Sequence, residues 1–244
     1  MNKIELYNQA DNIIKSHTAT QDELFQALHT LQQLAEENFV PAARTLGYIS
    51  QQFQQFEKSF DYFKQAMELG DEEASYQVAT CLCLGKGIEK DQKKAFDIMS
   101  QLAKNENNIT AIFELGLYFL NGIGIAKDAI TAFKCFEHAA KNNFSGAQNS
   151  LALCFINATG TQQDINAALY WFYQAAKNGH TPAYCSAAYL IENYDNFGKD
   201  KELATDFYVV GARLGDKNAL QYIIDNNINI EQFPKDININ LKFN

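Results

Sequence analysis

The sequence predicts an all-α fold of repeated helix pairs, and three observations in its 244 residues point to it. An alanine recurs about every 36 residues, and an aspartate followed four residues later by an alanine recurs at the same spacing. Glycine-containing turns separate segments whose apolar residues fall at helical spacing. A fixed period of this length is typical of stacked supersecondary units. The alanines are Ala42, Ala74, Ala111, Ala147, Ala183 and Ala219, in steps of 32, 37, 36, 36 and 36, and the aspartates are Asp91, Asp128, Asp164 and Asp200.

Two helices are expected before the first complete repeat. Residues 4–16 place Leu6, Ala10 and Ile13 at helical spacing, and residues 22–38 follow a polar helix start at Thr20. The second segment ends like the later repeats and is interpreted as the second helix of an incomplete leading copy. Because a terminal copy must cover an otherwise exposed apolar face, residues 1–38 are expected to cap the array.

Five repeats are expected over residues 42–215, each with two helices. The first copy lacks turn glycines, which predicts a tighter connection at residues 51–55. A last helix is expected at 219–226, and 227–244, which contains a proline and lacks a helical period, is expected to be a C-terminal tail. The prediction is one solenoid over 1–226 followed by that tail. The five copies are 42–70, 74–107, 111–143, 147–179 and 183–215.

The recurring small and acidic residues have structural explanations. Alanine at the crossing points lets two helices approach within roughly 8–10 Å. Glycine in the turns permits backbone angles that a Cβ disfavours. The recurring aspartate stands where an N-cap side chain accepts hydrogen bonds from the free amides of the second helix. None of these residues is a candidate site.

Composition disfavours several classes of function. The formal charge of −9 and the pI near 4.9 disfavour nucleic acid as a partner, since binding it requires Lys and Arg, and are compatible with a basic protein partner. No apolar run approaches the roughly 18 residues of a membrane span, so no membrane association is expected. Five cysteines, an odd number, favour buried thiols in a reducing compartment. The start of the chain lacks the apolar core of a signal peptide, and a cytoplasmic protein is expected.

The usual catalytic patterns are missing from the sequence. The four histidines, at positions 17, 29, 138 and 180, have no metal-ligand spacing with Cys, Asp or Glu. The Gly-x-Gly turns lack the preceding strand and the Gly-Lys-Ser/Thr ending of a phosphate-binding loop. We therefore expect no catalytic residue, no metal and no cofactor.

The repeated pattern A-x3-LG-x-Y…G-x-G…D-x3-A…AA resembles the Sel-one-like repeat family, a relative of the tetratricopeptide repeat. The resemblance covers about residues 38–226 and implies a right-handed α/α superhelical solenoid of five to six helix pairs, which we expect to be monomeric. Copies one and five depart most, with Ala187-Ala188 replacing Leu-Gly in copy five. In copy three the match is carried by Ala111, Leu115, Gly116, Tyr118, Gly122, Gly124, Asp128, Ala132, Ala139 and Ala140.

The resemblance also implies a function. Members are mostly non-catalytic adaptors that hold a protein or peptide on a concave face, and similar bacterial proteins include immunity proteins that neutralise a co-encoded toxin. Two hypotheses follow: an adaptor, or an immunity protein whose acidic groove blocks a basic toxin. A hydrolase is the least supported function, because no residue pattern favours it.

By resemblance to the tetratricopeptide groove, the residues two and six positions after the recurring alanine that opens each first helix face the concavity. This alanine is called the opening alanine below. Several of them are aromatic or Arg, and tyrosine and arginine are enriched at interface hot spots. The alternative that the apolar members pack between neighbouring copies stays open. The candidate partner-binding residues are Arg44, Tyr48, Tyr76, Phe113, Asn149 and Tyr189, with Glu192 on an acidic rim.

Overall fold

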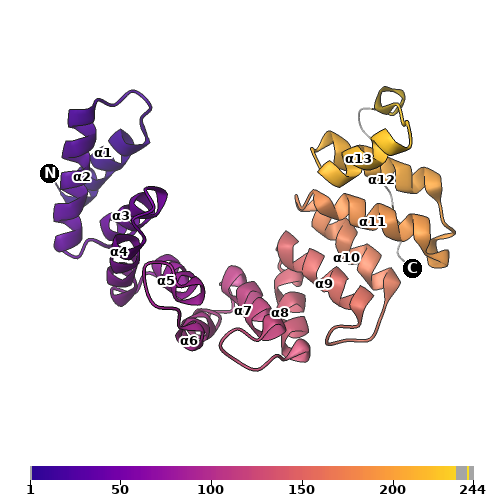
Figure 1. Cartoon of the computed structure of the whole chain (residues 1–244), viewed down its shortest axis with the longest axis horizontal. Helices are drawn as coiled ribbons and strands as arrows, with labels where there is room; N and C mark the ends of the chain where they lie inside the picture. Colours follow the sequence, from indigo (N-terminus) through magenta and orange to yellow (C-terminus); the bar gives the residue numbers. More distant parts are fainter. Residues whose placement is uncertain (1, 235–240, 242–244) are drawn as a thin grey trace. The chain divides into compact units, whose positions relative to one another are not determined.

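The computed structural model describes residues 2–234 and 241, and within them the chain is all-helical (Figure 1). These residues form thirteen α-helices and two short 3-10 helices, η1 and η2, and contain no β-strand. The predicted all-α class is confirmed. The elements are α1 (Lys3–Lys15), α2 (Gln21–Glu36), α3 (Val40–Gln52), α4 (Phe56–Glu68), α5 (Glu72–Leu84), α6 (Gln92–Leu102), α7 (Ile109–Asn121), α8 (Ala129–Lys141), α9 (Ser145–Asn157), α10 (Ile165–Lys177), α11 (Pro182–Asn193), η1 (Asp195–Phe197), α12 (Lys201–Arg213), α13 (Lys217–Asp225) and η2 (Ile230–Gln232).

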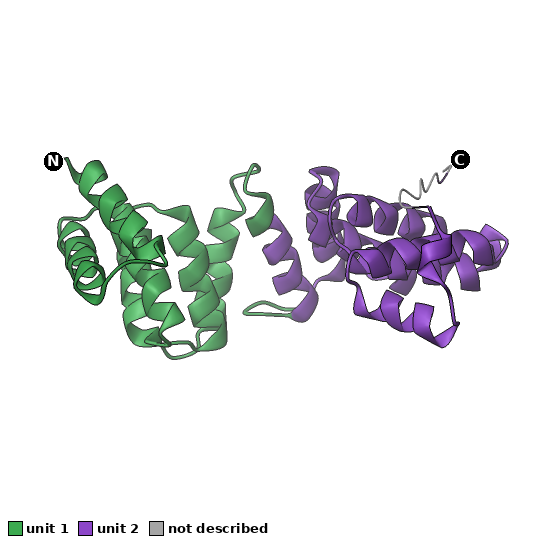
Figure 2. Cartoon of the chain, turned by 90° about the horizontal axis from the view of Figure 1, so that it is seen from above, with its two compact units in different colours: residues 1–111, 122–126 green, residues 112–121, 127–244 purple. Residues whose placement is uncertain are grey.

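The chain divides into two compact units, each with its own packed helix pairs (Figure 2). Unit 1 comprises Met1–Ala111 and Gly122–Ala126, and unit 2 comprises Ile112–Asn121 and Lys127–Asn244. In unit 1, α3 packs on α4 and α5 on α6; in unit 2, α9 packs on α10 and α11 on α12. The six recurring alanines lie near the starts of α3, α5, α7, α9, α11 and α13 and are at most 1% exposed. The predicted pairing of helices in repeats is confirmed.

Within a pair, a small residue of the first helix receives a large side chain of the second. The small residue stands five positions after the opening alanine. A Cβ added at Gly47 would lie 2.6 Å from the Phe63 ring, and one added at Gly116 would lie 2.7 Å from the Phe136 ring. Ala152 takes this position in α9 and is fully buried. The size of this residue therefore limits how closely the two helices of a pair approach.

The recurring aspartates cap the second helices as predicted. Asp128 Oδ1 accepts the backbone N–H of Thr131 at 3.0 Å, and Asp164 Oδ1 accepts that of Ala167 at 2.9 Å. Asp91 and Asp200 make the equivalent bonds at α6 and α12. A cap of this kind stabilises a helix by about 1 kcal/mol, which explains why the residue recurs with the period of the fold.

The turn glycines do more than permit the turn. Gly124 has φ +69°, and a Cβ added there would lie 2.0 Å from the carbonyl oxygen of Gln92, the first residue of α6. Gly160 stands in the same relation to Ala129, the first residue of α8, also at 2.0 Å. The turn of one repeat thus lies directly against the second helix of the repeat before it. No side chain fits between them.

The connection between α3 and α4 is shorter than that between α5 and α6. Only residues 53–55 separate α3 from α4, whereas residues 85–91 separate α5 from α6, so the predicted tighter connection is confirmed.

After α13, Ile228, Ile230 and Phe233 pack against the core of unit 2. The Arg213 guanidinium donates to the carbonyls of Ile230 at 3.1 Å and Phe233 at 3.0 Å, which ties this segment to the end of α12. The rest of the expected tail, 235–240 and 242–244, lies outside the described residues.

Replacing Gly124 with alanine should destabilise unit 1 more than the left-handed backbone angle alone explains. Gly198 is a matched control, because it has φ +68° but no atom within 4 Å of an added Cβ. We expect Gly198→Ala to lower the free energy of unfolding by about 1–2 kcal/mol and Gly124→Ala by about 3 kcal/mol, since only the second also meets the α6 backbone. Urea unfolding followed by circular dichroism measures both, and equal losses would disprove the packing role of the turn.

Candidate functional site

In unit 1, the predicted residues Arg44 and Tyr48 lie on α3 and contact the start of α5. The Arg44 guanidinium pairs with Asp71 at 2.7 Å and with Glu73 at 3.1 Å. The Tyr48 hydroxyl donates to Glu73 Oε1 at 2.7 Å. Asp71 also caps α5 by accepting the backbone N–H of Ala74 at 2.6 Å. These contacts join two successive repeats, so both predicted binding residues also have a structural role.

The electrostatic state of this network follows from its contacts. Burial, together with the Glu73 carboxylate, raises the pKa of Tyr48 to about 12. The phenol is therefore neutral at physiological pH and remains a hydrogen-bond donor. Two carboxylates share the single positive charge of Arg44, so this part of the surface keeps a negative charge.

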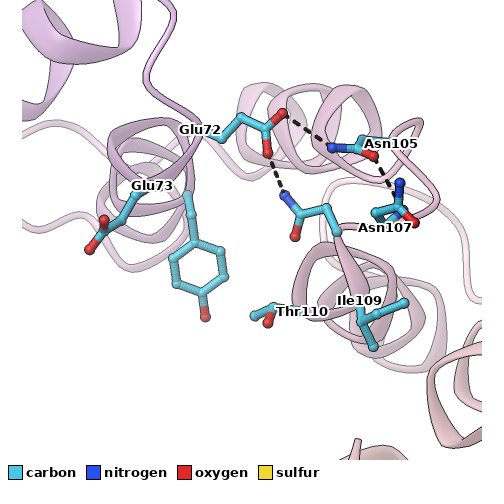
Figure 3. Close-up of a pocket in the computed structure, with 8 residues that line it drawn as sticks. Glu72, Glu73, Asn105, Asn107, Ile109 and Thr110 are labelled. Atoms are coloured by element: carbon cyan, nitrogen blue, oxygen red, sulfur yellow. Dashed lines mark hydrogen bonds between the residues drawn. The ribbon is translucent and has the colours of Figure 1, made fainter. Parts of the chain in front are cut away.

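Beside this network, unit 1 has a pocket of about 530 Å³ around the predicted residue Tyr76. The pocket lies between the start of α5 and the link that leads into α7 (Figure 3). The Glu72 carboxylate accepts hydrogen bonds from the side-chain amides of Asn105 at 3.4 Å and Asn108 at 3.1 Å, while Glu73 points away from these amides. The lining residues are Glu72, Glu73, Tyr76, Asn105, Asn107, Asn108, Ile109 and Thr110.

The pocket has acidic character and contains no basic side chain among its lining residues. Glu72 is held by neutral amides, so its charge is fixed in place without being compensated. A carboxylate beside a tyrosine ring suits a cationic side chain such as lysine or arginine. The groove pattern did not single out the asparagines, although the polar run 105–108 and the 37-residue step between Ala74 and Ala111 mark the longer link that carries them.

In unit 2, the predicted residues occupy different environments. Phe113 on α7 packs against the rings of Phe136, with centroids 5.7 Å apart, and Phe144, at 5.0 Å. It therefore contributes to packing between α7 and its neighbours, the alternative that the sequence left open, and its role in binding stays a prediction. Asn149 is half-buried on α9.

Tyr189 on α11 is the most accessible of the predicted aromatic residues in unit 2, at 56% exposed. Leu153, six positions after the opening alanine of α9, is 43% exposed. Glu192, one turn after Tyr189, accepts a hydrogen bond from the Tyr222 hydroxyl at 3.2 Å. Burial and Glu192 raise the pKa of Tyr222. Unit 2 therefore carries an exposed tyrosine one helical turn before a carboxylate that is hydrogen-bonded to α13.

A metal centre needs clustered ligands, and a thiol nucleophile needs a lowered pKa. The described part of the chain contains no group of three or more His, Cys, Asp or Glu that could hold a metal ion. All five cysteines are free, and burial raises the pKa of Cys154 and Cys185 to about 11, which disfavours the reactive thiolate form of these two side chains at neutral pH. No described helix is long and apolar enough to cross a membrane.

Comparison with known families finds the Sel1 repeat in four consecutive segments. They are residues 46–71, 72–107, 109–144 and 145–180, which together make up more than half of the chain. A solved Sel1 repeat protein from Oxalobacter formigenes is similar over 75% of this chain and 74% of its own, with 26% identity and a TM-score of 0.65.

Two further proteins are similar over part of their length. The protective antigen c5321 of uropathogenic Escherichia coli, which has an SLR fold, is similar over 91% of this chain and 48% of its own. The identity is 20% and the TM-score is 0.77. Chitin synthase regulatory factor 3 of Schizosaccharomyces pombe is 27% identical over 124 residues, half of this chain and 12% of that protein. The similarity to c5321 supports the fold alone. The yeast protein, whose name describes a regulatory factor, is a distant relative.

The contacts of Arg44 predict that its removal weakens the junction between α3 and α5. Arg44→Gln should lower the free energy of unfolding by about 1 kcal/mol, because Asp71 is largely buried and loses its partner. Lys64→Gln is the matched control: Lys64 lies 3.9 Å from Glu68 with both side chains exposed, so we expect less than about 0.5 kcal/mol. Chemical denaturation gives both values, and an Arg44 variant as stable as the control would leave Arg44 without a structural role.

Proposed function

This chain belongs to the Sel1 repeat family, and on that premise we propose that it is a non-catalytic adaptor that binds a partner protein or peptide. Proteins with this repeat are generally protein-interaction scaffolds. The proposed contacts come from the first helix of each helix pair, in both units. They are Arg44, Tyr48 and Tyr76 in unit 1, and Phe113, Asn149, Tyr189 and Glu192 in unit 2.

The pocket of unit 1 is the observation that carries the proposal. It is lined by Tyr76 and two carboxylates, and one of these, Glu72, is positioned by amides without a cation. A lysine or arginine of a partner would supply the missing positive charge and could stack on the tyrosine ring. The preferred partner is therefore a basic segment, in line with the net charge of −9.

In unit 2, the exposed side chains of Leu153 and Tyr189 support contact with apolar residues of the partner. Tyrosine supplies a large contact area at a small entropy cost and is enriched at hot spots. We propose that Glu192 adds a charged contact beside them. The segment bound by unit 2 would combine apolar and basic residues.

An immunity protein in a bacterium is the second candidate, and the acidic charge favours it. A toxin with a basic surface would be captured quickly because the opposite charges steer the encounter. The two candidates differ in affinity: an immunity complex should be nanomolar or tighter and weakened by salt, whereas an adaptor should bind several short peptides weakly. For either role we propose a cytoplasmic location, because five free thiols suit a reducing compartment.

The proposal predicts that tyrosine truncations reduce partner binding. The tagged chain is used to capture partners from the lysate of its own cells, and the affinity for each captured protein is then measured by calorimetry. Tyr76→Ala and Tyr189→Ala should each weaken binding by roughly tenfold or more, as expected for hot-spot residues. Raising the salt from low to physiological levels should weaken it further.

The matched controls are tyrosines on second helices. Tyr62 on α4 is half-buried like Tyr76, and Tyr170 on α10 is partly exposed like Tyr189. Their alanine variants should bind like the unchanged chain. If the Tyr76 and Tyr189 variants retain every partner while a control loses one, the proposed surface is wrong. Turnover of a substrate by the purified chain would disprove the non-catalytic role.

A further inference from the structure

The side chain of Asn108 connects the pocket of unit 1 to the start of α7. Its amide nitrogen donates to Glu72 Oε2 at 3.1 Å, and its carbonyl oxygen Oδ1 accepts the backbone N–H of Ala111 at 3.0 Å. Ala111 is the third residue of α7, so the second hydrogen bond is that of an N-cap. One amide group therefore holds the pocket carboxylate with its nitrogen and the helix with its oxygen.

Asn105 offers a comparison within the same pocket (Figure 3). Its amide nitrogen also donates to Glu72, at 3.4 Å, but its carbonyl oxygen accepts the backbone N–H of Asn107 at 3.2 Å. Both of these hydrogen bonds join Glu72 to the link itself. Those of Asn108 reach one step further, into the first turn of α7.

Glu72 can hold a cation without releasing either amide. An ionised carboxylate has about four acceptor sites, and the two amides occupy one on each oxygen. A guanidinium can therefore bind the remaining sites through two parallel N–H groups. The neighbouring Glu73 already pairs with Arg44 at 3.1 Å, which makes Glu72 the better site for an arginine of a partner.

A guanidinium bound to Glu72 would restrain Asn108 as well. The hydrogen bond from Asn108 to Glu72 is exposed, so water competes with it and it opens locally. Charge-assisted hydrogen bonds are shorter and roughly twice as strong as neutral ones. An arginine that fixes the Glu72 carboxylate therefore fixes the amide nitrogen of Asn108. The oxygen of the same amide then stays on the Ala111 N–H.

We propose that Asn108 couples the pocket to α7, so that an arginine side chain bound to Glu72 stabilises the first turn of this helix. The coupling rests on the proposed function, because it requires a basic partner in the pocket. Helix α7 begins in unit 1, and its residues Ile112–Asn121 belong to unit 2. Since coupling between binding events is reciprocal, a partner that orders α7 from unit 2 would raise the affinity of the pocket for arginine.

Hydrogen exchange of single backbone amides, followed by NMR on the full chain, tests the coupling. The probe is N-acetyl-arginine amide, and N-acetyl-citrulline amide is its neutral control. At saturation, the arginine probe should slow exchange of the Ala111 amide about fivefold, the low end of usual coupling between sites. The Ala167 amide, which Asp164 caps at 2.9 Å in unit 2, should exchange at an unchanged rate.

Two serine variants separate the coupling from the cap itself. Asn108→Ser keeps a capping side chain on α7, because serine caps a helix about as well as asparagine, but it lacks the amide that donates to Glu72. This variant should bind the probe more weakly, and at saturation its Ala111 amide should exchange as in the free chain. Asn105→Ser is the matched control, which loses the other amide on Glu72 and should keep the fivefold slowing.

The outcomes separate the coupling from the preference for a basic partner. An arginine probe that binds no better than citrulline, or whose binding survives Glu72→Gln, would overturn both. A probe that binds at Glu72 without slowing exchange at Ala111 would overturn the coupling alone. So would a probe that slows this exchange equally in the Asn108→Ser variant.

Discussion

The packing within this fold depends on close approach inside the helix pairs and, in three of the repeats, between successive pairs. Inside a pair, a glycine or alanine of the first helix receives a large apolar side chain of the second. Between pairs, the turn glycines Gly87, Gly124 and Gly160 each lie against the first residue of the preceding second helix. The contact between pairs leaves no room for a Cβ, and the contact inside a pair leaves none for a side chain larger than alanine. Since protein interiors are packed as densely as organic crystals, these close contacts set the distances between neighbouring helices.

The sequence was sufficient to predict the helix pairs, because the residues at these points are small and recur with one period. The aspartate caps were predictable for the same reason, since an N-cap has a definite local chemistry. The turn glycines were predicted from their backbone angles alone. Their contact with the preceding helix joins residues more than 30 positions apart, as with Gly124 and Gln92, and a local pattern carries no sign of it.

The candidate site was less accessible to sequence reasoning. Counting from the recurring alanine selected Arg44 and Tyr48, but their partners Asp71 and Glu73 lie at the start of the next first helix, α5. The ion pair and the hydrogen bond that join them are therefore tertiary contacts. The pocket near Tyr76 depends on three asparagines in a link, where the repeat pattern is weakest. Partner recognition depends on residues that differ between copies, whereas a repeat pattern reports what the copies share.

The contact between a glycine turn and the second helix before it also gives the array a direction. The turn at Gly87 lies on the start of α4, and the turn at Gly160 lies on the start of α8, in both cases a segment nearer the N-terminus. During synthesis the chain appears from that end. The helix against which a turn packs has therefore already left the ribosome when the turn emerges. The growing chain can then fold repeat by repeat, without waiting for residues still to be made.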